Sequence, residues 1–220
     1  MRTDIEIGEC RQAAWFEELT DSKQSHAIDV FTKTMHDAID GIAGRIALPN
    51  VIEIIFSSER NMGRGAYACA FERRVWFSKK TYDKLLGEGD ALLGLCAHEL
   101  SHVSDFETYN DCRTGEGWRE FIVSEGKAEN VAIEIAGDDY IKQLCTKSPS
   151  DEEIEKAFSS RRDFSRYFRK IDSKKKYAVS AAFVDRVKKH FDISVFQLHR
   201  WSTECIIEQF EAAIGVTKTR

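Results

Sequence analysis

The 220-residue chain has only two prolines, Pro49 and Pro149, and its thirteen glycines are spread thinly. So few turn-forming residues argue against an all-β fold with many short strands and favour long helices. The longest apolar runs, 91–97 and 131–136, are much shorter than the roughly 20 residues that a membrane-spanning helix needs. A transmembrane protein is therefore not expected. The apolar content of 42% and the charged content of 31% are typical of a folded globular protein.

The chain also has no excess of basic charge, since 32 Lys and Arg residues against 37 Asp and Glu residues give a net charge of −5. Proteins that bind nucleic acid through its phosphates are ordinarily basic, so no nucleic-acid partner is expected. The first ten residues carry acids where a secretory signal peptide has a basic flank and an apolar stretch. We therefore expect a cytoplasmic protein.

No Cys-x-x-Cys pair and no zinc-ribbon spacing is present among the cysteines, which argues against a structural zinc site built from thiolates. The six are Cys10, Cys69, Cys96, Cys112, Cys145 and Cys205. In a reducing compartment they are expected to be free thiols. A chain of this length buries roughly 70% of its unfolded surface, so it needs no disulfides for stability.

Hydrophobic periodicity predicts an α+β fold. Apolar residues at helical spacing predict a helix over 24–44, with Pro49 ending that element. The residues of 51–56, 65–71 and 75–77 favour strands, the last two forming a hairpin. From Ser78 onward nearly everything is predicted helical. The expected helices lie near 79–87, 90–106, 117–137, 151–170, 174–191 and 195–214, with capping-box patterns at Ser150 and Ser194.

These elements predict a small twisted sheet of about three or more strands packed on helices, followed by a mainly helical C-terminal half. We expect a single domain over residues 1–220. Its N-terminal sublobe, about 1–115, would hold the sheet, and its helical sublobe would cover about 116–220.

One short motif carries chemistry: residues 98–102 read His-Glu-Leu-Ser-His, behind the apolar stretch 90–97 of a buried helix. Residues i and i+4 of a helix lie on one face about 6 Å apart, so His98 and His102 can bind the same metal ion. Zn²⁺ accepts neutral imidazole readily, and the adjacent Glu99 could take a proton from water at the metal. The alternative is two ordinary surface histidines. The apolar stretch disfavours it, because unpaired polar groups are costly to bury.

Downstream, residues 125–128 read Glu-Gly-Lys-Ala on a second predicted helix. The two motifs together resemble the gluzincin zinc metallopeptidases, a family of the peptidase MA-like superfamily with a zincin-like fold. The resemblance implies one catalytic Zn²⁺ on His98, His102 and Glu125, with Glu99 as general base. It also implies that Glu129, one turn beyond Glu125, orients His98 through a hydrogen bond; an exposed helix acid is the alternative.

Two other acids compete for the place of third ligand. Asp105 lies near the face of the histidines but about 10 Å along the axis from His98, so it could reach the metal only if the helix broke after His102. No glycine or proline marks such a break. Glu120 is at a plausible distance but lacks the Gly-x-Ala context. Glu125 is the preferred ligand.

The family also implies an edge strand that pairs with the extended substrate above the metal. The strand 65–71, with the candidate substrate residues Gly65, Ala66, Tyr67 and Ala68, resembles this edge strand. All of these residues except Tyr67 are small enough for a peptide backbone to approach. An inner strand packed beneath a helix is the alternative.

A tyrosine often holds the oxyanion in related peptidases, in a Tyr-x-x-Gly context. Tyr177 occupies a similar context with Ser180 in place of glycine, and a buried structural tyrosine is the alternative. Tyr140 and Tyr167 are weaker candidates. The four remaining histidines, at 26, 36, 190 and 199, are interpreted as structural.

The sequence thus predicts a zinc-dependent hydrolase of peptide bonds, with a peptide or protein as substrate. It has neither the third histidine of the metzincins nor the Gly-x-Met-x-Asn signature of the large aminopeptidases, so endo- and exopeptidase modes stay open. The rival hypotheses are a non-catalytic, zinc-stabilised interaction protein and a zinc hydrolase with a non-peptide substrate.

Overall fold

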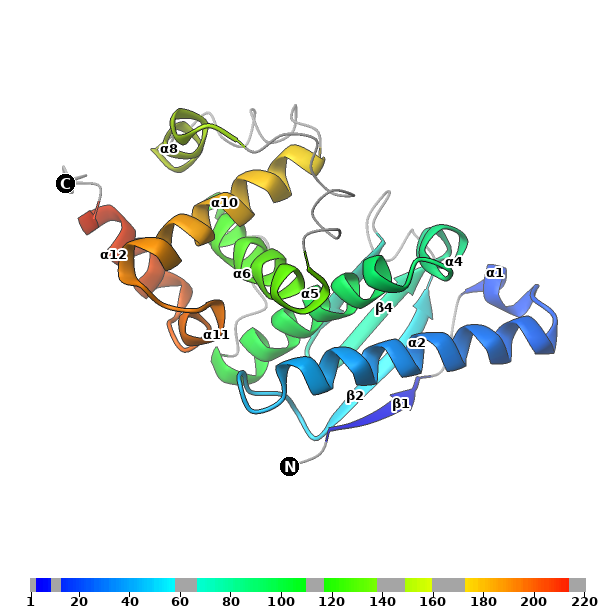
Figure 1. Cartoon of the computed structure of the whole chain (residues 1–220). Coiled ribbons are helices and arrows are strands. Elements are labelled where there is room, and N and C mark those ends of the chain that lie inside the picture. The colour runs from blue at the N-terminus through cyan, green and yellow to red at the C-terminus, as the bar shows by residue number, and fades with distance from the viewer. Residues whose placement is uncertain are drawn as a thin grey trace. The chain divides into compact units, whose positions relative to one another are not determined.

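The computed structural model describes residues 3–8, 13–57, 67–109, 117–137, 149–159 and 173–213, and they form an α+β protein (Figure 1). The strands are β1 (Asp4–Ile7), β2 (Val51–Ser57), β3 (Ala68–Phe71) and β4 (Arg74–Ser78). The helices are α1 (Ala14–Glu17), α2 (Asp21–Ile42), α4 (Lys79–Leu85), α5 (Gly89–Tyr109), α6 (Trp118–Ala136), α8 (Asp151–Ser159), α10 (Ser173–Phe191), α11 (Val195–Leu198) and α12 (Thr203–Ala213). Two compact units emerge: Met1–Cys112 with Ala132–Tyr140, and Arg113–Val131 with Ile141–Arg220.

The four strands form one mixed sheet in the order β1-β2-β4-β3. Strand β2 pairs in parallel with both β1 and β4, and β3 pairs antiparallel with β4, which confirms the predicted hairpin. Strand β1 was not predicted. Its four residues alternate two acids with two isoleucines, which is too short a pattern to distinguish a strand from a loop, and its pairing with Val51–Ile54 is a tertiary contact that the local sequence does not encode.

One face of the sheet forms the core of the first unit. Along β2, Ile52, Ile54 and Phe56 are fully buried and alternate with partly buried residues, as expected of a strand with one covered face. Helix α2 covers this face, where the ring of Phe31 lies 5.3 Å from that of Phe56 and 4.6 Å from that of Phe77. Helix α5 packs beside α2 and against β3 and β4. The sheet therefore supports the helix that carries both histidines.

Most of the helix predictions are confirmed, and both capping boxes are present. The Ser150 and Ser194 hydroxyls each accept a hydrogen bond from the backbone N–H three residues later, at 3.2 Å, while Glu153 and Gln197 bond back. Helix α2 ends at Ile42, before Pro49, and Gly44 follows with a φ of 73°, a left-handed conformation that favours glycine. Of the helix predicted over 151–170, Asp151–Ser159 is helical and 160–170 lies outside the described residues.

The single helix predicted over 195–214 was wrong. Two helices occupy this span, with a break over 199–202. Ser202 explains the break, because its hydroxyl accepts a hydrogen bond from the N–H of Cys205 at 3.2 Å and so caps the start of α12.

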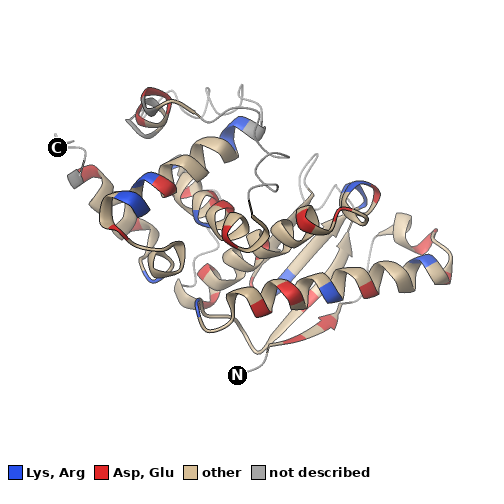
Figure 2. Cartoon of the chain, in the orientation of Figure 1, with Lys and Arg blue, Asp and Glu red and all other residues tan. Residues whose placement is uncertain are grey.

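None of the helices in the described part of the chain has a stretch long and apolar enough to span a bilayer. Acidic and basic residues are interspersed along α2 (Figure 2). Lys33 and Asp37 of this helix form an exposed ion pair at 2.9 Å, of the kind that lines a solvated helix face.

Two helices of the second unit, α6 and α10, approach each other closely at Gly126. A Cβ atom added to Gly126 would lie 2.3 Å from the carbonyl oxygen of Ser180 and 2.5 Å from a methyl group of Val184. Ser180 is completely buried there. Small residues at 126 and 180 thus allow the backbones to meet, which gives a packing reason for the glycine of the Glu-Gly-Lys-Ala motif and for a small residue at 180.

Gly126→Ala should destabilise the protein. Alanine improves helix propensity by about 1 kcal/mol, but overpacking against a backbone carbonyl costs about 1–3 kcal/mol or more and should outweigh that gain. Gly41→Ala is the matched control, because its added Cβ would meet the terminal methyl group of Ile135 at 2.9 Å, which a rotamer change can move. Urea unfolding of both variants measures the difference. Equal stabilities would show that α6 and α10 do not meet at Gly126.

Candidate metal centre

Helix α5 brings the two histidines to one face. The segment that precedes the polar motif, from Ala91 to Ala97, is apolar and mostly buried. Helix α5 packs against α2 and β3, which holds the helix in place. His98 is 6% exposed and His102 is partly buried. Helix α5 continues without a break to Tyr109, so Asp105, although buried, lies two turns beyond His98. The helix break that Asp105 would need to bind the same metal is absent.

Glu125 comes from α6 and is 6% exposed. It immediately precedes Gly126, where α6 packs on α10, and is followed by the buried Ala128. These small residues let α6 lie close to its neighbours while the longer carboxylate side chain projects from the same turn. Glu120, the competing acid on this helix, is only partly buried.

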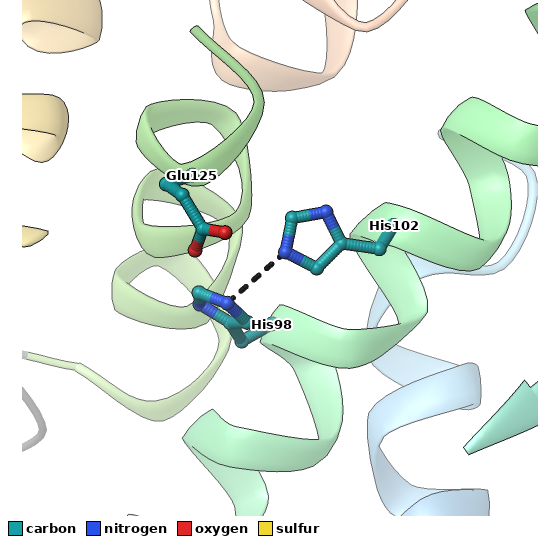
Figure 3. Close-up of side chains that lie close together, drawn as sticks. All are labelled: His98, His102 and Glu125. Atoms are coloured by element: carbon teal, nitrogen blue, oxygen red, sulfur yellow. Dashed lines mark hydrogen bonds between the residues drawn. The ribbon is translucent and has the colours of Figure 1, made fainter. Parts of the chain in front are cut away.

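The side chains of His98, His102 and Glu125 converge (Figure 3). One ligand atom from each lies within 4.8 Å of the other two. The Nε2 atoms of the two imidazoles are 3.2 Å apart, with the ring planes at 74°. In Figure 3 the Glu125 carboxylate points toward the same space as the two ring nitrogens. The three residues could therefore hold a metal ion.

This geometry fits a tetrahedral ion. Two nitrogens each about 2.0–2.1 Å from such an ion lie roughly 3.3 Å apart, close to the separation of the two Nε2 atoms. A shared hydrogen bond gives a similar distance but needs a proton on one Nε2, whereas metal binding uses both lone pairs. Two imidazoles and a carboxylate suit Zn²⁺, and the same set occurs around Fe²⁺. The donor set fits a metal without choosing between these two.

Burial supports a cation at this place. Three glutamates, Glu99, Glu125 and Glu129, are 4–6% exposed. Placing carboxylates in a protein interior is costly unless cations or hydrogen bonds compensate the charge. A divalent ion on His98, His102 and Glu125 would supply such compensation.

Glu99 follows His98 on α5 and acts electrostatically on β3. Burial, and to a lesser extent the negative charge of Glu99, raise the pKa of the Cys69 thiol on β3 to about 12. Burial and the same charge raise the pKa of Cys96 as well. Among the described strands, β3 is the last in the sheet and pairs only with β4. Its Cys69 therefore lies within electrostatic reach of the candidate general base.

Ala68 begins β3, and Tyr67 precedes it in a bend. The carbonyl of Tyr67 accepts a hydrogen bond from the N–H of Ser78 at 3.0 Å and another from the Thr81 hydroxyl. Gly65 and Ala66, the rest of the predicted substrate segment, lie outside the described residues, and the substrate role of this strand stays a prediction.

Tyr177 lies in the first turns of α10, partly buried, with its ring 6.5 Å from that of Phe121 on α6. Phe121 is one turn before Glu125, so Tyr177 packs near the helical face that carries the carboxylate. The roles predicted for Tyr177 and for the buried Glu129 stay predictions. Tyr140 and Tyr167 lie outside the described residues.

The sequence analysis did not find the electrostatic coupling of Cys69 to Glu99. The sequence marked this strand only by its run of small and apolar residues and by its resemblance to a substrate-binding edge, and the proximity of residues 69 and 99 arises from packing between α5 and β3.

No protein-family model matches this chain, and neither a curated protein nor a solved structure is significantly similar to it. The resemblance to gluzincins therefore depends on the two motifs and on the geometry of the residues they contribute.

Purified without a polyhistidine tag, the protein should bind one zinc ion per chain. Glu125→Gln should weaken zinc binding by more than the roughly 10–100-fold typical of outer-shell changes, because it removes a direct ligand. Glu120→Gln, the same change on the same helix, should leave the affinity unaltered. Equilibrium dialysis with elemental analysis measures both and identifies the metal. Equal losses in the two variants would exclude Glu125 as the third ligand.

In metal-free protein at pH 8, the Cys69 thiol should be alkylated slowly, since at a pKa of about 12 only about one thiol in ten thousand is ionised. Glu99→Gln removes a negative charge that opposes the thiolate, so it should speed alkylation; burial, the larger cause, persists and keeps the gain modest. Mass spectrometry of the Cys69 peptide gives the rate. Glu107→Gln, an exposed acid on α5, is the control. Identical rates in all three proteins would place Glu99 out of reach of β3.

Proposed function

We propose that this protein is a zinc-dependent peptidase of gluzincin type, with His98, His102 and Glu125 as metal ligands and Glu99 as general base. The observation that carries the proposal is the convergence of the three ligand atoms within 4.8 Å, with Glu99 next in the chain to the first of them. The α+β fold with a small mixed sheet is compatible with a zincin-like architecture.

A bound zinc ion would supply a Lewis acid that polarises the scissile carbonyl and lowers the pKa of an attacking water toward 7. Glu99 would accept the proton of that water and deliver it to the leaving amine. The carboxylate suits this shuttle because it is buried, so bulk water does not compete for the proton, and because its helix is fixed by packing.

Strand β3 supports a peptide substrate in preference to a small molecule. A strand with an unpaired side can bind an extended peptide through main-chain hydrogen bonds. Helix α5 packs against β3, so this strand runs beside the helix that carries the proposed base. An extended chain paired to β3 would therefore bring a peptide carbonyl toward the metal centre.

Two residues complete the proposal. Tyr177 would donate its hydroxyl hydrogen to the oxyanion, a contribution worth about 2.7–4 kcal/mol in comparable sites. Glu129 would orient His98, which raises the basicity of the imidazole. We also propose that the protein is cytoplasmic.

Glu99→Gln should retain zinc and lose hydrolysis by at least about 10²–10⁴-fold, the usual contribution of general acid–base catalysis. The amide has the shape of the carboxylate but accepts no proton at neutral pH. A quenched-fluorescence peptide library measures cleavage, and elemental analysis measures zinc in the same samples. Glu107→Gln should cleave at the wild-type rate. If Glu99→Gln cleaves as well as the wild type, Glu99 is not the base.

Wild-type protein that binds zinc stoichiometrically and cleaves no peptide in the library would favour a non-catalytic zinc protein. Turnover of small esters or amides in the absence of peptide cleavage would instead favour a hydrolase with a non-peptide substrate.

A further inference from the structure

A buried asparagine joins the helix of the third ligand to α10. Asn130 lies on α6 and is 3% exposed. Its side-chain nitrogen donates two hydrogen bonds of 2.9 Å, one to the carbonyl of Gly126 in its own helix and one to the carbonyl of Ala181 in α10. Its side-chain oxygen accepts a 3.0 Å hydrogen bond from the ammonium group of Lys188, also in α10.

The chemistry of the partners fixes the orientation of this amide. The Lys188 ammonium can only donate, so the oxygen of Asn130 must face it. The two backbone carbonyls can only accept, so the NH₂ group must face them. Both protons of the amide nitrogen are used, and a flipped amide would lose all three bonds. Asn130 is therefore held in one rotamer across the contact between α6 and α10.

The two backbone carbonyls do not need these hydrogen bonds to be satisfied. The carbonyls of Gly126 and Ala181 both lie within helices, where backbone N–H groups four residues later are their regular partners. What the amide adds is a fixed register between the two helices. Gly126 also meets the Ser180 backbone one turn away along α6. The amide bonds and this contact together restrict the sliding of α6 along α10.

Glu125 is the residue immediately before Gly126, and Tyr177 lies one turn before Ala181 on α10. A sliding or rotation of α6 against α10 would change the direction in which the Glu125 side chain projects and would move Tyr177 relative to Glu125. A metal ligand must be held to within a few tenths of an ångström, so such a shift would weaken metal binding even in a fully folded chain.

We propose that Asn130 is a positioning residue of the metal centre, whose amide holds α6 in register with α10 and thereby fixes Glu125 for metal binding. This inference rests on the proposed function in that it takes Glu125 as a metal ligand, but it does not depend on peptide hydrolysis. The sequence analysis did not find Asn130, because no spacing rule marks an amide that acts between helices.

Asn130→Ala removes the three hydrogen bonds and tests the proposal. Zinc affinity, measured by chelator competition well below the unfolding temperature, should fall about 10–100-fold, the range of outer-shell substitutions. The visible absorption spectrum of the cobalt-substituted protein should change as well, because it reports ligand geometry. Should Asn130→Ala not fold, Asn130→Ser takes its place, since its hydroxyl can bond Gly126 but does not reach α10.

Ile206→Ala is the matched control. Ile206 is completely buried on α12 in the core of the same unit and takes no part in the amide bonds, so its loss destabilises the fold while the three hydrogen bonds of Asn130 remain. If positioning alone controls these two readouts, the zinc affinity of Ile206→Ala should stay within about twofold of the wild type. Its cobalt spectrum should be unchanged.

Zinc affinity of an Asn130 variant within twofold of the wild type overturns the proposal, and so does an equal loss in Ile206→Ala. Failure of both Asn130 variants to fold would assign the amide to stability alone and also overturns it. If the wild type binds zinc but cleaves no peptide, the proposed function fails and the positioning role is still decided by these affinities. If the wild type binds no zinc, both fail.

Discussion

The proposed metal centre depends on two imidazole nitrogens that lie 3.2 Å apart beside a buried carboxylate. The arrangement needs a rigid helix for the histidines and a second element that brings a carboxylate to the same point. Helix α5 provides the first because its apolar half is buried against α2 and the sheet. Helix α6 provides the second, and its glycine next to Glu125 allows close packing on α10.

The polar groups of this region are buried to an unusual degree for a small protein. Glu99, Glu125, Glu129 and Asn130 are all at most 6% exposed. Such burial would be unfavourable for a fold that used these residues only for packing, since apolar side chains would fill the space at lower cost. Their presence is more easily understood if they are retained for chemistry, with the amide of Asn130 keeping the ligand helix in place.

Much of the fold and site could be predicted because the signals were local. Spacing of four between His98 and His102 fixes their common face, and caps at Ser150 and Ser194 fix helix starts. What could not be predicted depends on residues distant in the sequence. Strand β1 exists through its pairing with β2, Cys69 meets the charge of Glu99 through packing, and Asn130 bonds a helix some fifty residues away. The break before α12 was missed because Ser202 is one capping residue in an otherwise helical pattern.

The most direct test of the metal centre is zinc K-edge X-ray absorption on the purified protein. The account predicts nitrogen and oxygen neighbours only, at about 2.0–2.2 Å, with the outer-shell scattering of two imidazole rings. A sulfur neighbour at about 2.3 Å, scattering from fewer than two imidazoles, or the absence of bound zinc would contradict it.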